Sequence, residues 1–420
     1  MLTAQRRSST KSMGDSTTAT IPGDPNDNIQ HLRAIAILYV LCQHFSWLRP
    51  DLPLFPWDAW SGVDLFFAIS GYVISLSLAR TLTMPADARG LVGKLLANKN
   101  SITAFLLKRF FRVGLPLFAT LALAALLTLT FGITTWRNLL VEAAAALSMT
   151  YNYVLYAGGP FLLDVLWSLA IEMQFYLLIP IFLVAFFTRR ERLFASAAIF
   201  AFIGLLARPY YVYFYATPSN NWLAVRTATH CRLDTLAAGV FVFALLSDPD
   251  TRRAVGSLSA PCIRIVTAFS LFVLLLIPGT TSTYFSHNEG FSILALAAGC
   301  AVLMAAGSNA CIAPFAASRA FLGYIGERSF SLYLVHRLVA ASFAAASPSV
   351  IAHTHVYGQV GTSARVLQTV CVIGLTLILA ELMFRFAERP GVRIGREFAA
   401  KKFGGEARHG ANYLQVSPPI

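Results

Sequence analysis

Residues 166–180 read LWSLAIEMQFYLLIP and belong to an apolar run from 165 to 187 in which Glu172 is the only charged residue. A membrane-spanning helix needs about 20 mostly apolar residues, so this run is long enough to cross a bilayer. A carboxylate in hydrocarbon is costly, and such residues face a bundle interior where they mark functional sites. The stretch therefore predicts a helix inside a membrane bundle, with Glu172 as a functional candidate.

The rest of the chain has a similar composition. Of its 420 residues, 56% are hydrophobic and only 13% are charged, whereas an average soluble domain carries about 25% charged residues. Runs that fit a membrane helix are 31–49, 61–79, 113–132, 165–187, 194–214, 226–247, 263–279, 290–307, 320–345 and 366–387. The chain is therefore predicted to be all-α, a polytopic membrane helix bundle of about ten transmembrane helices.

The basic residues predict the orientation of the bundle. Lysines and arginines cluster between 80 and 112, between 188 and 193, between 248 and 264, and after 388, whereas the alternate connections 50–60, 280–289 and 346–364 have none. Cytoplasmic connections carry the excess of Lys and Arg, so both termini are expected in the cytoplasm. The stretch 138–157 is expected to lie in the interface or dip into it, because a full span there would move the basic turn 188–193 outside.

This topology divides the chain into three parts. Residues 1–29 are rich in Ser and Thr and precede the first apolar run, so they are expected to be a flexible cytoplasmic tail. Residues 30–390 form the expected transmembrane domain, and 391–420 a basic cytoplasmic C-terminal tail. The net charge of +13 is explained by orientation in the membrane, and nucleic-acid binding is not expected. The six cysteines form no CxxC pair, and neither a disulfide framework nor a metal site is expected.

The first expected helix carries two polar residues on one face. Arg33 and His44 are eleven residues apart, which returns the helix to within about 20° and moves about 16 Å along its axis. Glu172 falls at a similar depth to His44 when each helix is measured from its own membrane surface. The mechanism that we expect has the Glu172 carboxylate orienting the His44 imidazole as a general base, although matching depth does not by itself establish contact between the two side chains. A packing role for the histidine is the alternative.

Other polar residues suggest binding sites. Arg109 and Arg112 are three residues apart and can grip a phosphate together, although they also fit a role in topology alone. Tyr333 and His336 share a helix face and suit an acceptor site, with packing as the alternative. Asp64 opens the second expected helix, where it can bind a partner or cap the helix.

Taken in order, these blocks resemble the membrane-integral acyltransferase family 3, whose members transfer acyl groups from acyl-CoA to envelope glycans and related acceptors. The matching blocks are Arg33 with His44, Gly62–Gly71, Lys108–Arg112 with Pro116, Trp167–Tyr176, Ser331–His336 and Arg385–Pro390. The chain departs from the family pattern at Met173 and Arg337, and the latter bears on acceptor choice.

The resemblance implies a function and a set of site residues. His44, Arg33 and Glu172 are the expected catalytic residues, and Arg109 and Arg112, with Arg33, the expected acyl-CoA-binding residues. The residues expected to bind the acceptor are Asp64, Ser70, Trp167, Tyr333 and His336. The expected reaction moves an acyl group, acetyl being favoured and succinyl the alternative, from cytoplasmic acyl-CoA to a hydroxyl of an extracytoplasmic carbohydrate or glycolipid.

The expected partners are therefore acyl-CoA, the acceptor and membrane lipid, and the expected location is a bacterial inner membrane. Direct transfer and an acyl-enzyme intermediate both remain open. A transporter or flippase for a lipid-linked sugar is the second hypothesis, because the same buried charges can line a substrate path. The absence of an inverted repeat in the sequence speaks against it, and a purely structural or receptor role leaves the polar residues at common depth unexplained.

Overall fold

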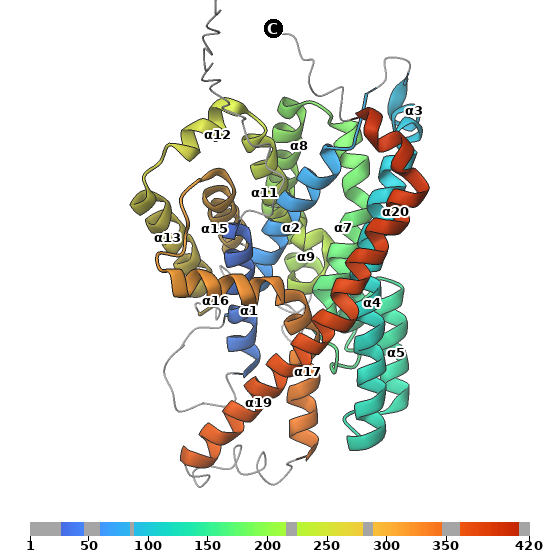
Figure 1. Cartoon of the computed structure of the whole chain (residues 1–420), viewed down its shortest axis with the longest axis vertical. Helices are drawn as coiled ribbons and strands as arrows, with labels where there is room; N and C mark the ends of the chain where they lie inside the picture. Colours follow the sequence, from blue (N-terminus) through green and yellow to red (C-terminus); the bar gives the residue numbers. More distant parts are fainter. Residues whose placement is uncertain are drawn as a thin grey trace, which may run out of the picture.

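The computed structural model describes residues 27–45, 59–84, 88–215, 225–279, 289–346 and 362–410. Within these ranges every regular element is a helix (Figure 1). In the first half of the chain they are α1 (Asp27–Phe45), α2 (Gly62–Ala79), α3 (Gly90–Ala97), α4 (Lys99–Phe131), α5 (Trp136–Leu147), α6 (Tyr151–Tyr156), α7 (Leu166–Ala185), α8 (Arg189–Phe202), η2 (Ile203–Ala207) and α9 (Arg208–Tyr215).

The second half continues in the same way. Its helices are α11 (Thr229–Leu246), α12 (Pro249–Gly256), α13 (Ala260–Gly279), α15 (Glu289–Gly307), α16 (Ala316–Glu327), α17 (Ser329–Ala346), α19 (Thr362–Met383), η3 (Phe384–Glu388) and α20 (Arg389–Gly410). Eight segments of the described chain are long and apolar enough to cross a membrane. The all-α, multi-pass character is therefore confirmed, whereas the count of about ten and the orientation stay predictions.

The expected span 320–345 is wrong as a single helix. The structure divides it at Arg328 into α16 and α17, and α16 lies across the direction of α17 in Figure 1. The Arg328 guanidinium is bound by Glu381 of α19 and stacks on the Tyr324 ring at 3.6 Å. A charged residue held in this way stabilises the corner between α16 and α17. The mean hydropathy of the run 320–345 does not reveal this corner, because most of the residues on both sides of Arg328 are apolar.

Two helices extend further than their apolar runs. The expected span 113–132 belongs to the 33-residue helix α4, so the pair Arg109 and Arg112 lies within a helix. At the other end, α19, η3 and α20 follow one another directly, so the expected tail from 391 is helical as far as Gly410. The predicted span 31–49 corresponds to α1 only as far as Phe45, because 46–49 lie outside the described residues.

The stretch 138–157 forms the two short helices α5 and α6, and neither is among the candidate spans. Glu142 of α5 is fully buried, and its carboxylate accepts hydrogen bonds from the backbone N–H groups of Leu162 and Leu163, at 2.8 and 3.0 Å. Burial raises the pKa of Glu142 to about 7. This carboxylate therefore ties α5 to the segment that enters α7.

Close backbone contacts and buried charges hold α2 against α11. A Cβ at Gly71 would lie 2.2 Å from the Leu236 carbonyl oxygen, and one at Gly239 would lie 2.1 Å from the Ala68 oxygen. Small residues let membrane helices approach in this way. Next to this contact, Arg232 donates to Asp64 at 2.5 Å, and both side chains are fully buried.

Candidate active site

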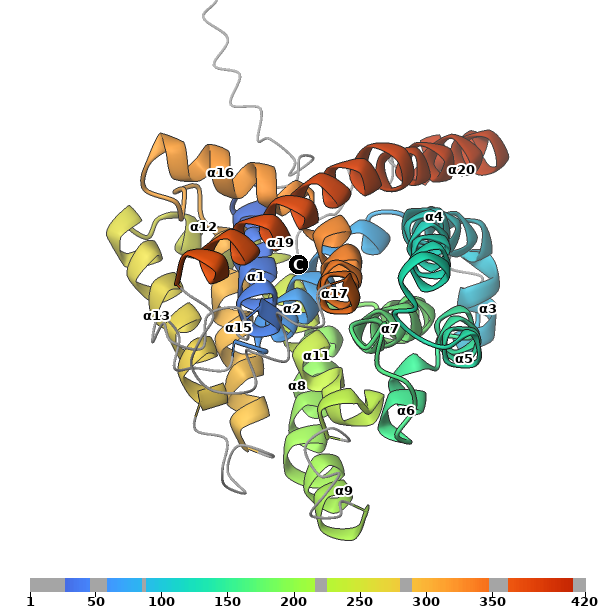
Figure 2. The ribbon, with the colours of Figure 1, turned by 90° about the horizontal axis from the view of Figure 1, so that it is seen from below.

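A cavity of about 1740 Å³ is enclosed mainly by α1, α2, α4, α7, α17, η3 and α20. Small-molecule pockets are usually about 300–1,000 Å³, so this cavity can hold an extended ligand. Figure 2 shows α2, α7 and α17 near the middle of the bundle, with α4 and α20 to one side. Six of the ten predicted site residues line the cavity: Arg33, Ser70, Arg109, Arg112, Glu172 and Tyr333.

Glu172 lies in the wall formed by α7. Its carboxylate accepts hydrogen bonds from the Ser70 hydroxyl at 2.8 Å and from the Tyr176 hydroxyl at 2.6 Å. The Arg109 guanidinium lies over the Tyr176 ring at 5.6 Å and over the Phe105 ring at 5.5 Å. The carboxylate is therefore fixed by two hydroxyl groups from two helices. The Arg109 guanidinium packs on the ring of one of these partners, Tyr176.

Tyr333 of α17 lines the cavity, whereas His336 on the same helix does not. Its hydroxyl donates to the Val165 carbonyl oxygen at 2.8 Å and lies 2.6 Å from the Ser168 hydroxyl. The Phe66 ring meets it edge-on at 6.2 Å. The tyrosine ring therefore forms the boundary between the cavity and the residues that follow it on α17.

His44 lies beyond this boundary, against His336. The two ring centroids are 5.0 Å apart, and His336 is also 5.9 Å from the Tyr333 ring. His336 Nδ1 is 3.2 Å from the Leu332 carbonyl oxygen, which can only accept, so this nitrogen carries the proton. Its Nε2 is buried and meets no hydrogen-bond partner among the residues that the structure describes.

This geometry corrects the expectation that Glu172 orients His44. In the described part of the chain the carboxylate binds Ser70 and Tyr176, while the neighbour of the imidazole is a second histidine. Two residues at the same depth in the membrane can still be far apart in the plane of the membrane. The packing of α1 against α17 decides which side chain His44 meets.

Asp64 and Trp167 lie outside the cavity lining. Asp64 is fully buried in its ion pair with Arg232, so a role in packing explains it better than contact with an acceptor. Trp167 packs edge-on against Phe67 at 6.0 Å and lies under the Arg226 guanidinium at 5.8 Å.

Arg337, the departure from the family pattern, has a partner on the loop before α7. It donates to Asp164 at 2.8 Å, and burial raises the pKa of that carboxyl. The sequence analysis missed this pair because nothing in the spacing connects positions 164 and 337.

The cavity is also lined by arginines that were expected only to set the topology, namely Arg80, Arg252, Arg393 and Arg396, and by Arg389 of the block Arg385–Pro390. Three of these, Arg389, Arg393 and Arg396, lie on α20. These three are spaced by four and three residues, which is the spacing of one helix face and could have been noticed.

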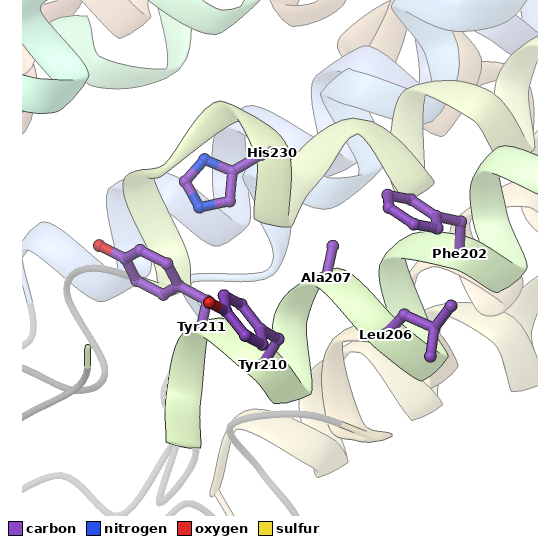
Figure 3. Close-up of a pocket in the computed structure, with 6 residues that line it drawn as sticks. All are labelled: Phe202, Leu206, Ala207, Tyr210, Tyr211 and His230. Atoms are coloured by element: carbon purple, nitrogen blue, oxygen red, sulfur yellow. The ribbon is translucent and has the colours of Figure 1, made fainter. Parts of the chain in front are cut away.

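A second, smaller hollow of about 590 Å³ opens on α8, η2 and α9. Figure 3 shows its lining of Phe202, Leu206, Ala207, Tyr210, Tyr211 and His230. None of the predicted site residues contributes to it. Its apolar side chains are largely exposed, as expected of a surface that faces lipid.

Comparisons with known proteins agree with the resemblance. A family model described as an acyltransferase domain matches residues 26–385. The peptidoglycan O-acetyltransferase OatA of Listeria monocytogenes is 27% identical over 385 residues, which cover 86% of this chain and 55% of that protein. The O-acetyltransferase OatA of Staphylococcus aureus is 28% identical over 416 residues, which cover 93% of this chain and 61% of that protein. The chain thus spans little more than half the length of these relatives. No solved structure matches the chain.

Proposed function

The chain belongs to the acyltransferase 3 family, and on that premise we propose that it is a membrane O-acetyltransferase that carries acetyl groups from cytoplasmic acetyl-CoA to hydroxyl groups of an extracytoplasmic carbohydrate. The names of the relatives support acetyl over succinyl and oxygen over nitrogen as the acceptor atom. Of the two relatives named above, the Listeria protein is the one described as acting on peptidoglycan. For this chain we propose only the carbohydrate class of the acceptor.

The observation that carries the proposal is the set of residues that line the cavity. Arginines line it together with Glu172, Tyr176 and Tyr333, and the Tyr333 ring is 5.9 Å from the ring of His336. An acyl-CoA is an anionic nucleotide joined to a long arm with a thioester at its tip. Such a molecule would place its phosphates among the arginines and its thioester near Tyr333.

The chemistry assigned to His44 is general-base catalysis. The imidazole takes the proton of the acceptor hydroxyl, whose oxygen forms a bond to the thioester carbonyl carbon as the bond from carbon to sulfur breaks. The CoA thiolate leaves and takes up a proton. His336, fixed through Nδ1 by Leu332, packs against the His44 ring with 5.0 Å between the ring centroids and so restricts its orientation.

The test measures ester-linked acyl groups on surface carbohydrates of the source organism. Three strains are compared at equal protein abundance: cells lacking the protein, cells with the wild type restored, and cells with His44→Ala. We expect acetyl esters only in the restored strain, with the mass identifying the group. Full ester content with His44→Ala would refute the role of the base, and equal content in all three strains would refute the acceptor class.

A further inference from the structure

The cations that line the large cavity are all arginines. Its eight basic lining residues include no lysine, although Lys94, Lys99 and Lys108 lie on the neighbouring helices α3 and α4. Four glutamates share the lining, so arginine is in excess by four formal charges. A guanidinium presents a planar fork of donors that matches phosphate oxygens two at a time. The lining is therefore suited to a ligand with several phosphates.

The helix α20 contributes three of these arginines. Arg389, Arg393 and Arg396 are spaced by four and three residues, so they point from one face of the helix. Their side chains span about 10 Å along its axis, at 1.5 Å for each residue.

Glycines on α20 allow close packing against α4. A Cβ at Gly391 would lie 2.4 Å from the Phe111 carbonyl oxygen, and one at Gly395 would lie 3.1 Å from the Phe111 Cβ. The ring of Phe398 also meets that of Phe111, at 6.0 Å. This packing holds α20 against α4, and Arg389, Arg393 and Arg396 line the same cavity as Arg109 and Arg112.

The protein leaves these guanidinium groups largely unneutralised. Arg112 and Arg396 form no hydrogen bond or salt bridge with any residue that the structure describes. Arg389 stacks on the Phe384 ring at 4.8 Å, which orients it without cancelling its charge. Arg393 is 3.9 Å from Glu397, but both side chains are more than 70% exposed, so this pair is weak.

We propose that the arginine face of α20 binds the nucleotide end of the donor, a deeper assignment that rests on the proposed function. The thioester lies near Tyr333, beside His336, and the nucleotide end lies among the arginines that line the same cavity. Arg112 and Arg389 bind the pyrophosphate. Arg393 and Arg396, further along α20, bind the ribose 3′-phosphate, which is the phosphate group at the adenosine end of the molecule.

The experiment measures binding of CoA and of dephospho-CoA, which lacks the 3′-phosphate, to the full chain in nanodiscs of neutral lipid. For the wild type we expect CoA to bind at least about tenfold more tightly, the equivalent of about 1.4 kcal/mol. In the double variant Arg393→Gln/Arg396→Gln, CoA affinity should fall to that of dephospho-CoA, whose own affinity should not change. The matched control is Lys401→Gln/Lys402→Gln, which removes two charges from the same helix outside the cavity lining.

The outcomes separate this assignment from the proposed function. A wild type that binds neither nucleotide would refute the donor itself. A double variant that keeps the wild-type preference for CoA, or a wild type with no preference, would refute only the 3′-phosphate site. The titrations are repeated in anionic lipid and with inorganic phosphate to identify the ligand. A double variant that loses affinity for anionic lipid or free phosphate but not for CoA would also overturn the assignment. The variant Arg393→Lys/Arg396→Lys keeps both charges but removes the planar guanidinium groups. We expect its preference for CoA over dephospho-CoA to lie between those of the wild type and Arg393→Gln/Arg396→Gln.

Discussion

Arginines occur in two different settings in this protein. Between α2 and α11, Arg232 is fully buried and paired with Asp64, and a second buried pair joins Arg208 to Asp234. In the large cavity, Arg112 and Arg396 have no acidic partner within the described residues. The buried arginines are neutralised by the fold and so can contribute only to it. The cavity arginines keep their charge, so on the proposed function changing them should affect donor binding and leave folding intact.

The largest expected effect comes from breaking a buried pair. Arg232→Leu leaves the Asp64 carboxylate buried without its cation, and loss of one partner of such a pair costs about 3–5 kcal/mol. We expect a marked fall in the thermal midpoint of the detergent-solubilised protein. The double variant Asp64→Leu/Arg232→Leu should recover most of that loss, because no charge is left buried. A double variant no more stable than Arg232→Leu would contradict the assignment of a purely structural pair.

The next effect comes from separating the two arginine groups in the cavity. Gly391→Leu should push α20 away from α4, since even a Cβ there would lie 2.4 Å from a backbone oxygen. We expect CoA affinity in nanodiscs to fall by about tenfold or more, or about 1.4 kcal/mol. Gly374→Leu is the control, because nothing lies within 4 Å of a Cβ at that position. Equal affinity in both variants would show that the position of α20 does not matter to the donor.

A smaller effect is expected from a single cavity arginine. Arg112→Gln should weaken CoA binding about threefold to tenfold, since one charge-assisted contact among several is lost. Its thermal midpoint should stay within about 1–2 °C of the wild type, because surface changes of this kind are worth about 0.5 kcal/mol. A loss of stability comparable to that of Arg232→Leu would remove the distinction between the two settings.

The last effect is seen only as the pH changes, and it concerns a buried carboxylate that binds backbone N–H groups instead of an arginine. Because the pKa of Glu142 is raised to about 7 from an ordinary 4.5, the folded state holds its proton more tightly than the unfolded state. Its contribution to stability is therefore present below about pH 4.5 and is lost as the pH rises to 7. We expect the stability of the wild type relative to Glu142→Gln to fall by about 1 kcal/mol for each pH unit over this range. A relative stability that rises with pH would contradict the shift.

The sequence predicted the helical class and much of the cavity. Long apolar runs are unambiguous signals of membrane helices, and polar residues within them have to face the bundle interior. Arg33, Ser70, Glu172 and Tyr333 were found for that reason, and all four line the cavity. Their individual roles stay predictions.

The remaining features depend on packing that a single sequence does not encode visibly. Depth in the membrane placed His44 level with Glu172, but the contact between α1 and α17 gives it His336 as a neighbour. The corner at Arg328 depends on Glu381, which is 53 residues away. The spacing of the α20 arginines on one helix face is visible in the sequence, but that they line the cavity depends on how α20 packs against the rest of the bundle.

The most direct test of the central claim measures transfer and donor binding on the same preparations. Membrane vesicles with wild type, His44→Ala or Arg112→Gln receive radiolabelled acetyl-CoA, and alkali-labile label in carbohydrate is counted beside CoA affinity. We expect the wild type to label carbohydrate. His44→Ala should give only background label but keep its CoA affinity, whereas Arg112→Gln should show both less label and lower CoA affinity. Wild-type label in the His44→Ala vesicles would contradict the account.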